Sequence, residues 1–391
     1  MQIGEVASFQ NGYAFKSKDF VQDGKYKIIK IKELKNGKVR FFNDSASVNV
    51  DDERIIEKYI VEKGDVLFAL TGDPVNKNNP LSWVGRVSVY EDDQLVLLNQ
   101  RVCKLIPKKR LNAKYIYYYF RVFNNFYALA SIAKGSASQA NISTKDIEAM
   151  EITLPSLNIQ NKIVSVLDSI EEKINQNNKI NKNLEQQAQA IYQQMFIGNA
   201  SSDWAKGTLS DIADITMGQS PSSSSYNEDG NGTIFFQGRA EFGFRFPTVR
   251  LYTTEPKRIA CANDTLMSVR APVGDLNVAH TNCCIGRGLA AIHSKNNRQS
   301  FVLYTMLSLK KQLDVFNGEG TVFGSINRIS LNEMPLLIPS SEKIDEFEAL
   351  VAPMDAAVRN NYDEICRLEQ LRDTLLPKLM SGELDVSDID F

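Results

Sequence analysis

The 391-residue chain lacks the features that mark membrane and secreted proteins. It has no uninterrupted apolar run of about twenty residues, which a helix needs to cross a bilayer. Its first residues carry no basic stretch followed by an apolar one, so we expect no secretory signal, a cytoplasmic location and reduced thiols. The proportions of hydrophobic residues (43%) and charged residues (24%) are those of a globular protein.

Cysteine and histidine are scarce, with five and two residues respectively. No two cysteines form a CxxC pair. The one cluster of possible ligands, His280 with Cys283 and Cys284, has no second pair at metal-binding spacing. Because free cysteine packs readily as a small apolar side chain, we predict no metal site and no other cofactor.

Motifs that carry chemistry are also missing. The sequence has no Walker A loop, no GxSxG elbow and no paired carboxylates suited to a nuclease metal. Residues 316–320 match the FxGxG pattern of an S-adenosylmethionine loop, but a helical pattern precedes them where that loop needs a buried strand. An adenine-modifying enzyme needs a Pro-Pro step beside the flipped base, and the chain has none. We therefore predict a protein that recognises and does not catalyse.

The main positive signal is an internal repeat. Residues 142–155 align without gaps on residues 326–339, and residues 183–198 align on residues 367–382, both at a shift of 184 positions. Because the shift does not change between these two blocks, the segments between them have equal length in the two copies.

Weaker matches extend the repeat toward the N-terminus. Gly12 has a counterpart in Gly218, and Arg101 has one in Arg287. The shift falls from 206 at the first match to 184 at the last, so the first copy has about twenty more residues in its globular part. Short alternating strands, such as residues 95–106, and a few short helices make each globular part an expected α+β domain.

Each copy ends in an expected long helix. Apolar residues recur at 3-4 spacing over residues 158–196 and again in the matching stretch, which is typical of a coiled-coil seam. Pro155 and Pro339 mark the helix starts, and Gly198 and Gly382 stand where C-terminal caps belong. A helix of about 39 residues spans about 58 Å and can serve as a strut.

Four polar residues have expected roles in these helices. Ser156 and Ser340 are placed to cap the N-termini. Asn177 and Asn361 occupy equivalent positions inside the seams, where a buried polar pair at one level would fix the register of the helices. The alternative is a locally solvated seam, because residues 175–183 are rich in Asn and Lys.

The formal net charge of −2 is unevenly distributed. It divides into +5 for residues 1–157, zero for 158–198, +1 for 199–341 and −8 for 342–391. A nucleic-acid contact is therefore expected from the globular parts, while the acidic C-terminal part should face solvent or a protein partner.

Four passages follow one another along the first copy, and the second copy partly repeats them. They are Gly12-Tyr13-Ala14-Phe15-Lys16-Ser17, Gly64-Asp65-Val66-Leu67 leading into Thr71-Gly72, Asn99-Gln100-Arg101, and Gly135-Ser136 through Pro155 into the long helix. Each is weakly specific, but their order over almost the whole chain resembles the specificity subunit of Type I restriction-modification systems. The second copy departs from the pattern, with Gly218-Gln219-Ser220-Pro221 at the first passage.

The resemblance implies two α+β target recognition domains in a pseudo-two-fold arrangement, joined by two long antiparallel coiled-coil helices. Along the chain, the implied parts are a first domain (1–155), a first helix (156–198), a second domain (199–340), a second helix (341–382) and an acidic tail (383–391). Each domain would read one half of a bipartite double-stranded DNA target. The implied partners are two modification subunits, which methylate adenine with S-adenosylmethionine, and translocating restriction subunits.

Candidate DNA contacts are polar residues of the loops in the two globular parts, where Arg, Asn and Gln read bases and Lys holds phosphates. In the first part they are Lys16, Ser17, Lys18, Lys77, Asn78, Asn79, Lys134, Ser136, Ser138 and Gln139. In the second part they are Gln219, Ser220, Ser222, Ser223, Arg239, Arg245, Arg270 and Thr321. Arg101 and Arg287 are either further contacts or structural ion-pair partners.

Two other functions remain open from the sequence. One is a protein-interaction scaffold, in which two domains on a helical rod gather partners without reading DNA. The other is a self-contained DNA methyltransferase. If methylation of one bipartite motif is lost in cells that lack the chain, the chain recognises DNA and is not a scaffold alone. Binding of S-adenosylmethionine by the lone chain would support the methyltransferase.

Overall fold

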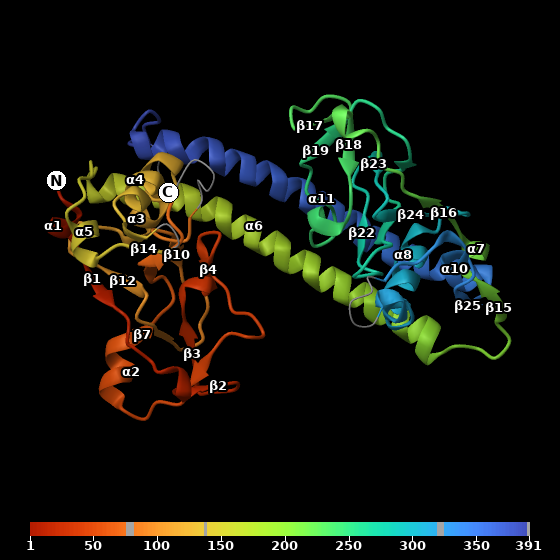
Figure 1. The fold of residues 1–391 in the computed structure, drawn as a ribbon, viewed down its shortest axis with the longest axis horizontal. Coiled ribbons are helices and arrows are strands. Elements are labelled where there is room, and N and C mark those ends of the chain that lie inside the picture. Colours follow the sequence, from red (N-terminus) through yellow and green to blue (C-terminus); the bar gives the residue numbers. More distant parts are fainter. Residues whose placement is uncertain (76–81, 137–138, 319–323, 389–391) are drawn as a thin grey trace. The chain divides into compact units, whose positions relative to one another are not determined.

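The computed structural model describes residues 1–75, 82–136, 139–318 and 324–388, and for Ser136 the backbone alone. The chain divides into two compact units (Figure 1). Unit 1 comprises Met1–Ile174 and Cys366–Phe391, and unit 2 comprises Asn175–Ile365. Both units contain helices and sheets, which confirms the expected α+β class.

A six-stranded sheet forms the centre of unit 1. Its strands in spatial order are β1 (Ala7–Asn11), β12 (Val102–Pro107), β8 (Val66–Ala69), β10 (Val87–Val89), β5 (Lys38–Val39) and β4 (Leu34–Lys35). Because side chains alternate along a strand, Phe68 of β8 packs on the helix side of this sheet and Leu67 packs toward the second sheet.

The second sheet of unit 1 has five strands, and a third has three. The five are β2 (Phe20–Val21), β6 (Ser47–Val48), β3 (Tyr26–Ile29), β11 (Val96–Leu98) and β7 (Ile60–Val61), and the three are β13 (Lys134–Ser136), β14 (Gln139–Asn141) and β9 (Thr71–Gly72). The short helices are α1 (Ile3–Val6), α2 (Glu53–Tyr59), α3 (Ala113–Tyr119), α4 (Phe123–Ser131) and α5 (Thr144–Glu148), with 3-10 turns η1 (Ser17–Asp19) and η2 (Ile31–Glu33).

Unit 2 is built on the same plan with fewer strands. A four-stranded sheet consists of β16 (Ala213–Met217), β24 (Leu289–Ser294), β21 (Thr265–Ser268) and β22 (Leu276–Val278). A five-stranded sheet consists of β17 (Tyr226–Asn227), β19 (Leu251–Thr253), β18 (Thr233–Phe236), β23 (Cys283–Ile285) and β20 (Ile259–Ala260). A third sheet pairs β15 (Ala205–Thr208) with β25 (Pro335–Ile338). The short helices are α7 (Leu209–Ile212), α8 (Gln299–Ser308), α9 (Lys310–Leu313) and α10 (Arg328–Asn332), with 3-10 turns η4 (Ser223–Ser225), η5 (Arg239–Glu241) and η6 (Asp314–Asn317).

The strand orders explain the unequal lengths of the two copies. The order β1-β12-β8-β10 in unit 1 corresponds to β16-β24-β21-β22 in unit 2. Unit 1 extends this shared sheet with β5 and β4, which have no equivalent in the four-stranded sheet of unit 2. The additional residues of the first copy therefore lie partly in an edge extension and leave the shared frame intact.

The chain turns a corner between two sheets at the same place in each unit. In unit 1 it leaves β11 of the five-stranded sheet and enters β12 of the six-stranded sheet through Asn99-Gln100-Arg101. In unit 2 it passes from β23 to β24 through Gly286-Arg287-Gly288. The single strand expected over residues 95–106 is therefore two strands, because the turn carries the chain from one sheet to the other.

Two long helices, α6 (Leu157–Tyr192) and α11 (Ser341–Ser381), contribute residues to both units. The Oγ atoms of Ser156 and Ser340 accept hydrogen bonds from backbone N–H groups three residues on, at 3.4 Å each, which confirms the predicted N-caps. Gly382 takes a φ of +77°, as a C-terminal cap requires. At the corresponding end, α6 continues into a π-helical turn, η3 (Gln193–Gly198), which ends at Gly198.

Within each unit, α6 and α11 run antiparallel and close the hydrophobic core. In unit 1, Leu167 of α6 and Leu379 of α11 belong to the core beneath α3. In unit 2, Tyr192 of α6 and Phe347 of α11 pack with Phe301 of α8, with ring centroids 5.7 to 6.4 Å apart. None of the described helices combines the length and apolar content needed to span a bilayer.

Candidate nucleic-acid interface

The corner between the sheets positions a second loop in each unit. The backbone N–H of Gly12 donates to Val102 O at 3.0 Å, and that of Gly218 donates to Leu289 O at 2.9 Å. A Cβ atom at either glycine would lie 2.1 to 2.2 Å from a backbone oxygen of the corner, closer than atoms can approach. Glycine is therefore required at both positions, which gives this weak sequence match a physical cause.

In unit 2 the corner borders a hollow of about 280 Å³. Its walls come from the ends of β18, β21 and β23 and carry three arginines, with no lysine among the lining residues. The lining consists of Gln237, Gly238, Arg239, Ser268, Arg270, Ala271, Arg287 and Gly288. Two predicted contacts, Arg239 and Arg270, therefore lie around one opening.

The three arginines differ in their partners. Arg239 donates to Asp275 Oδ2 at 2.7 Å, which holds its side chain on one side of the opening. Among the described residues, no carboxylate lies within ion-pair distance of Arg270 or Arg287. The structural ion pair considered for Arg287 is thus not present among these residues, and both guanidinium groups can bind a ligand.

The equivalent place in unit 1 is arranged differently. Thr71 Oγ1 donates to Asn141 Oδ1 at 2.6 Å, and Arg101 Nη1 lies 3.4 Å from both oxygens. Thr71 occupies the position in unit 1 that Arg270 occupies in unit 2, shortly after β8 and β21 respectively. Its backbone pairs with Asn141 of β14, as the backbone of Arg270 pairs with Ser325. Unit 1 thus places one arginine, a hydroxyl and an amide where unit 2 places two arginines.

The other candidates around the corner are exposed, except Ser220, which is half-buried. Lys16, Ser17 and Lys18 lie at η1, just after the Gly12 loop. In unit 2, Ser220 Oγ accepts the backbone N–H of Arg287 at 3.2 Å and so joins the two loops. Further candidates lie exposed on the Gly218 loop and at η4, namely Gln219, Ser222 and Ser223.

The remaining candidates of unit 1 lie on its three-stranded sheet or outside the described residues. Lys134 and Gln139 are exposed on β13 and β14, and Lys134 is 3.5 Å from Asp146. The backbone of Ser136 belongs to β13. Lys77, Asn78, Asn79 and Ser138 of unit 1, and Thr321 of unit 2, fall outside the described residues.

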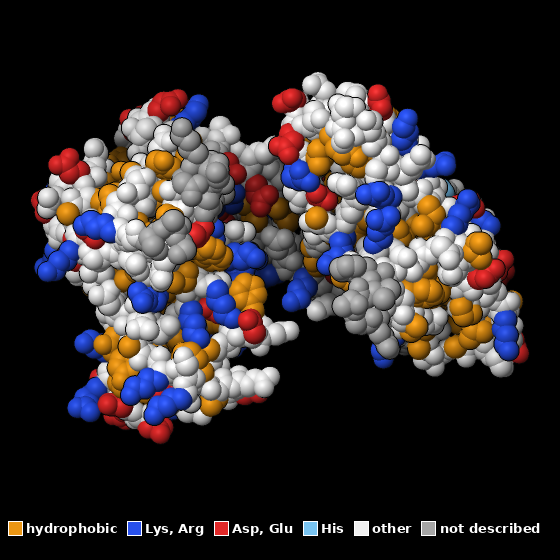
Figure 2. All heavy atoms as spheres, viewed as in Figure 1, with side chains coloured by type: hydrophobic (Ala, Val, Ile, Leu, Met, Phe, Trp, Pro, Cys, Tyr) orange, Lys and Arg blue, Asp and Glu red, His pale blue; other side chains and the backbone are white. Residues whose placement is uncertain are grey.

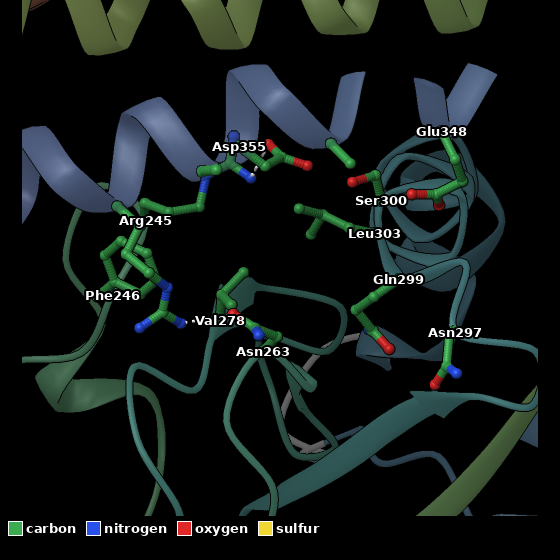
Figure 3. Close-up of a pocket in the computed structure, with 13 residues that line it drawn as sticks. Arg245, Phe246, Asn263, Val278, Asn297, Gln299, Ser300, Leu303, Glu348 and Asp355 are labelled. Carbon is green, nitrogen blue, oxygen red and sulfur yellow. Dashed lines mark hydrogen bonds and ion pairs between the residues drawn. The ribbon is translucent and has the colours of Figure 1, made fainter. Parts of the chain in front are cut away.

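Burial of Arg245 contradicts the predicted DNA contact. Only 6% of this residue is exposed, and its guanidinium is 3.0 Å from Asp355, which is drawn in Figure 3. It also lies 3.3 Å from Glu185. Burial disfavours the charged form of the guanidinium and by itself would lower its pKa. The neighbouring Tyr304 and Asp355 outweigh this effect and raise the pKa of Arg245 above its ordinary value. Arg245 therefore ties the second globular part to α6 and α11 inside unit 2.

The cavity drawn in Figure 3, of about 290 Å³, belongs to this same joint. Polar side chains that line the cavity form hydrogen bonds within the protein. Glu348 accepts a hydrogen bond from the backbone N–H of Phe301 at 2.7 Å, and Gln299 Nε2 donates to Thr265 Oγ1 at 3.1 Å. The first contact connects α11 to α8 and the second connects α8 to β21, so they do not resemble an open binding site.

Comparison with known proteins identifies the family. The model of the Type I restriction modification DNA specificity domain matches residues 1–186 and 201–348. The chain belongs to this family. The match covers both copies of the repeat, and so confirms the resemblance that the order of motifs had suggested.

Relatives of this DNA specificity family align along nearly their whole length. A Methanocaldococcus jannaschii protein described as the specificity subunit of the type I restriction enzyme MjaX is 29% identical over 381 residues, which cover 92% of this chain and 88% of that protein. The HindI specificity subunit of Haemophilus influenzae is 20% identical, over 86% of this chain and 90% of its own length. The crystal structure of the S subunit from M. genitalium gives a TM-score of 0.63 at 17% identity, covering 97% of this chain and 95% of that one, which shows a shared fold.

Surface charge in this specificity-family chain is mixed. On the face drawn in Figure 2, basic side chains are interspersed with acidic and apolar ones within each unit. The hollow of unit 2 is a local concentration of arginine on such a surface. Sequence reasoning missed Gln237 and Ser268 in its lining, because no motif marks residues that only the folded sheets bring together.

Proposed function

We propose that this chain is the non-catalytic subunit that gives a Type I restriction-modification complex its DNA sequence specificity. Residues 1–155 and 199–340 are the two target recognition domains, and residues 156–198 and 341–382 are the helices between them. Each domain reads one half of a bipartite double-stranded DNA target. The observation that carries the proposal is the corner beside Gly12 and Gly218, repeated in two domains that both match the family.

The proposed partners are two modification subunits that methylate adenine, together with restriction subunits. Names of relatives as type I restriction enzyme specificity subunits support such a complex. Exposed apolar side chains on the long helices, including Ile180, Leu350 and Leu371, are suitable for protein contacts.

Methylation mapping tests this function. DNA from cells that express the chain with its modification subunit should carry methyladenine in one bipartite motif, and DNA from cells without the chain should lack it. Replacing residues 1–155 by the corresponding domain of another family member should change one half of the motif only. Methylation that is unaffected by loss of the chain would favour a scaffold, and saturable binding of S-adenosylmethionine to the lone chain would favour a self-contained methyltransferase.

A further inference from the structure

The hollow of unit 2 holds two arginines on fixed backbone. Arg270 lies two residues after the end of β21 and pairs through its backbone with Ser325. Arg287 lies in the corner between β23 and β24, where its N–H donates to Ser220 Oγ at 3.2 Å. Side chains on rigid elements hold a ligand in a defined geometry better than side chains on free loops. The backbone positions from which these two guanidinium groups extend are therefore set by the sheets.

Small residues keep the opening clear between the arginines. Gly238, Ala271 and Gly288 line the hollow together with the three arginines. A Cβ atom at Gly288 would lie 2.8 Å from the backbone oxygen of Gln237, so a side chain at this position would disturb the wall. The hollow of about 280 Å³ is therefore open to a flat group that approaches the guanidinium groups.

The chemistry of the lining favours a base over a phosphate. Arginines, lysines and backbone amides all bind phosphates, whereas base edges are read chiefly by arginine, asparagine and glutamine, and this hollow is lined by arginines and Gln237 without a lysine. A guanidinium presents a planar fork of N–H donors that matches O6 and N7 of guanine in the major groove. The guanidinium of Arg239 forms an ion pair with Asp275 at 2.7 Å. The guanidinium groups of Arg270 and Arg287 therefore remain to donate hydrogen bonds to a base.

Unit 1 serves as an internal comparison. Its corner arginine, Arg101, lies within 3.4 Å of Thr71 and Asn141, and the position equivalent to Arg270 is the uncharged Thr71. A hydroxyl and an amide have different preferences among the bases from a pair of guanidinium groups. The two units should therefore read different bases at equivalent places in their half-sites.

We propose that the half-site read by unit 2 contains a guanine, and that Arg270 and Arg287 specify it through this hollow. The inference rests on the proposed function, because it assumes that unit 2 reads DNA. Arg270 and Arg287 are its specificity-determining residues, and Arg239 is a positioning residue held by Asp275.

Variants that keep the charge but lose the fork test the proposal in the complete complex with its modification subunits. R270K and R287K should each relax discrimination by about tenfold to a hundredfold at one G·C pair of the unit 2 half-site. R101K in unit 1 is the matched control and should leave that half-site unchanged. The swap of residues 1–155 assigns the half-sites, and methylation mapping of a randomised target library measures discrimination at each position.

A second measurement needs no variant. Target duplexes with 7-deazaguanine at that position lack the N7 acceptor, so the wild-type complex should bind them more weakly while the lysine variants lose less. Two results would overturn the inference: a unit 2 half-site without a G·C pair, or an equal loss by the variants on all sequences, which indicates phosphate contacts. Either result leaves a bipartite methylation motif in the wild type, whereas failure of the proposed function would abolish that motif.

Discussion

Asn361 Nδ2 donates a 2.8 Å hydrogen bond to Asn181 Oδ1 between α11 and α6 in unit 2. One turn away, Asn177 donates to Glu364 at the same distance. The repeat relates Asn177 to Asn361, as expected, but each bonds to another residue, because equivalent residues of antiparallel helices face each other only at the centre of the pairing. Asn177 and Asn181 are 1% and 3% exposed, so the alternative of a solvated seam is wrong at these positions.

Removing one amide of the Asn181–Asn361 pair should destabilise the protein more than replacing both amides by apolar side chains. N361A leaves the amide of Asn181 buried without its partner, and should lower the free energy of unfolding by about 1–3 kcal/mol. The double variant N181L/N361L replaces the pair by apolar groups and should recover most of that loss. Urea denaturation of the three proteins measures both effects. Equal destabilisation by the single and double variants would contradict a buried pair.

Glu171 of α6 is the centre of an ion cluster in unit 1. It accepts hydrogen bonds from Arg121 at 2.9 Å and Arg372 at 3.0 Å, and Lys38 lies 3.7 Å away. The variant E171Q leaves two largely buried arginines without their counter-charge, and should cost about 3–5 kcal/mol. Denaturation midpoints compare it with E172Q, an exposed neighbour on the same helix that should have almost no effect.

Acid should affect the two units in opposite directions. Burial alone would raise the pKa of Glu171, but Arg121, Arg372 and Lys38 hold it below the ordinary value, so its contribution is lost as pH falls through that lowered pKa. Burial raises the pKa of Glu348 in unit 2, so its contribution is full below the ordinary value and is lost as pH rises through the raised pKa.

The stability difference between wild type and E171Q should therefore shrink as pH falls below about 4.3, the ordinary glutamate pKa. Wild type should gain stability relative to E348Q as pH falls toward the same value. Urea denaturation of the three proteins at a series of pH values measures both trends. Parallel curves for all three would show that neither carboxyl titrates differently on folding.

Arg245 and Arg270 should separate stability from recognition. R245A leaves Asp355 and Glu185 without their counter-charge inside unit 2, and should destabilise the protein by about 3–5 kcal/mol. R270A removes an exposed side chain, and should change stability by no more than about 0.5 kcal/mol while it alters the methylated motif. Thermal melting and methylation mapping of both variants provide the readouts.

The isolated chain should bind duplex DNA weakly, and this binding should be sensitive to salt. Affinity without sequence preference comes from phosphate neutralisation, and the two globular parts carry formal charges of only +5 and +1. Addition of the modification subunit should tighten binding greatly. Fluorescence anisotropy over a range of salt concentrations measures this, and tight sequence-specific binding by the lone chain would refute the expectation.

The sequence predicted the frame of the molecule better than its contacts. Period and caps predicted α6 and α11, because a long amphipathic helix is determined by local pattern. The corner at Arg101 was missed within an apparent strand over residues 95–106, since the passage between sheets depends on distant partners. Arg245 was misassigned for the same reason: its charge suggested an exposed loop residue, but α11 covers it.

The acidic residues of the C-terminal segment, Glu383, Asp385 and Asp388, are exposed as its composition predicted, but the segment also carries an apolar residue that is buried. Val386 is 1% exposed within the core of unit 1, and Lys162 donates to the backbone oxygen of Ser387 at 2.6 Å. Unit 2 is continuous in sequence, whereas unit 1 needs residues from both ends of the chain. On the ribosome, the unit that emerges first is therefore completed last, and a nascent chain that stops before residue 366 would release a finished unit 2 beside an open, apolar unit 1.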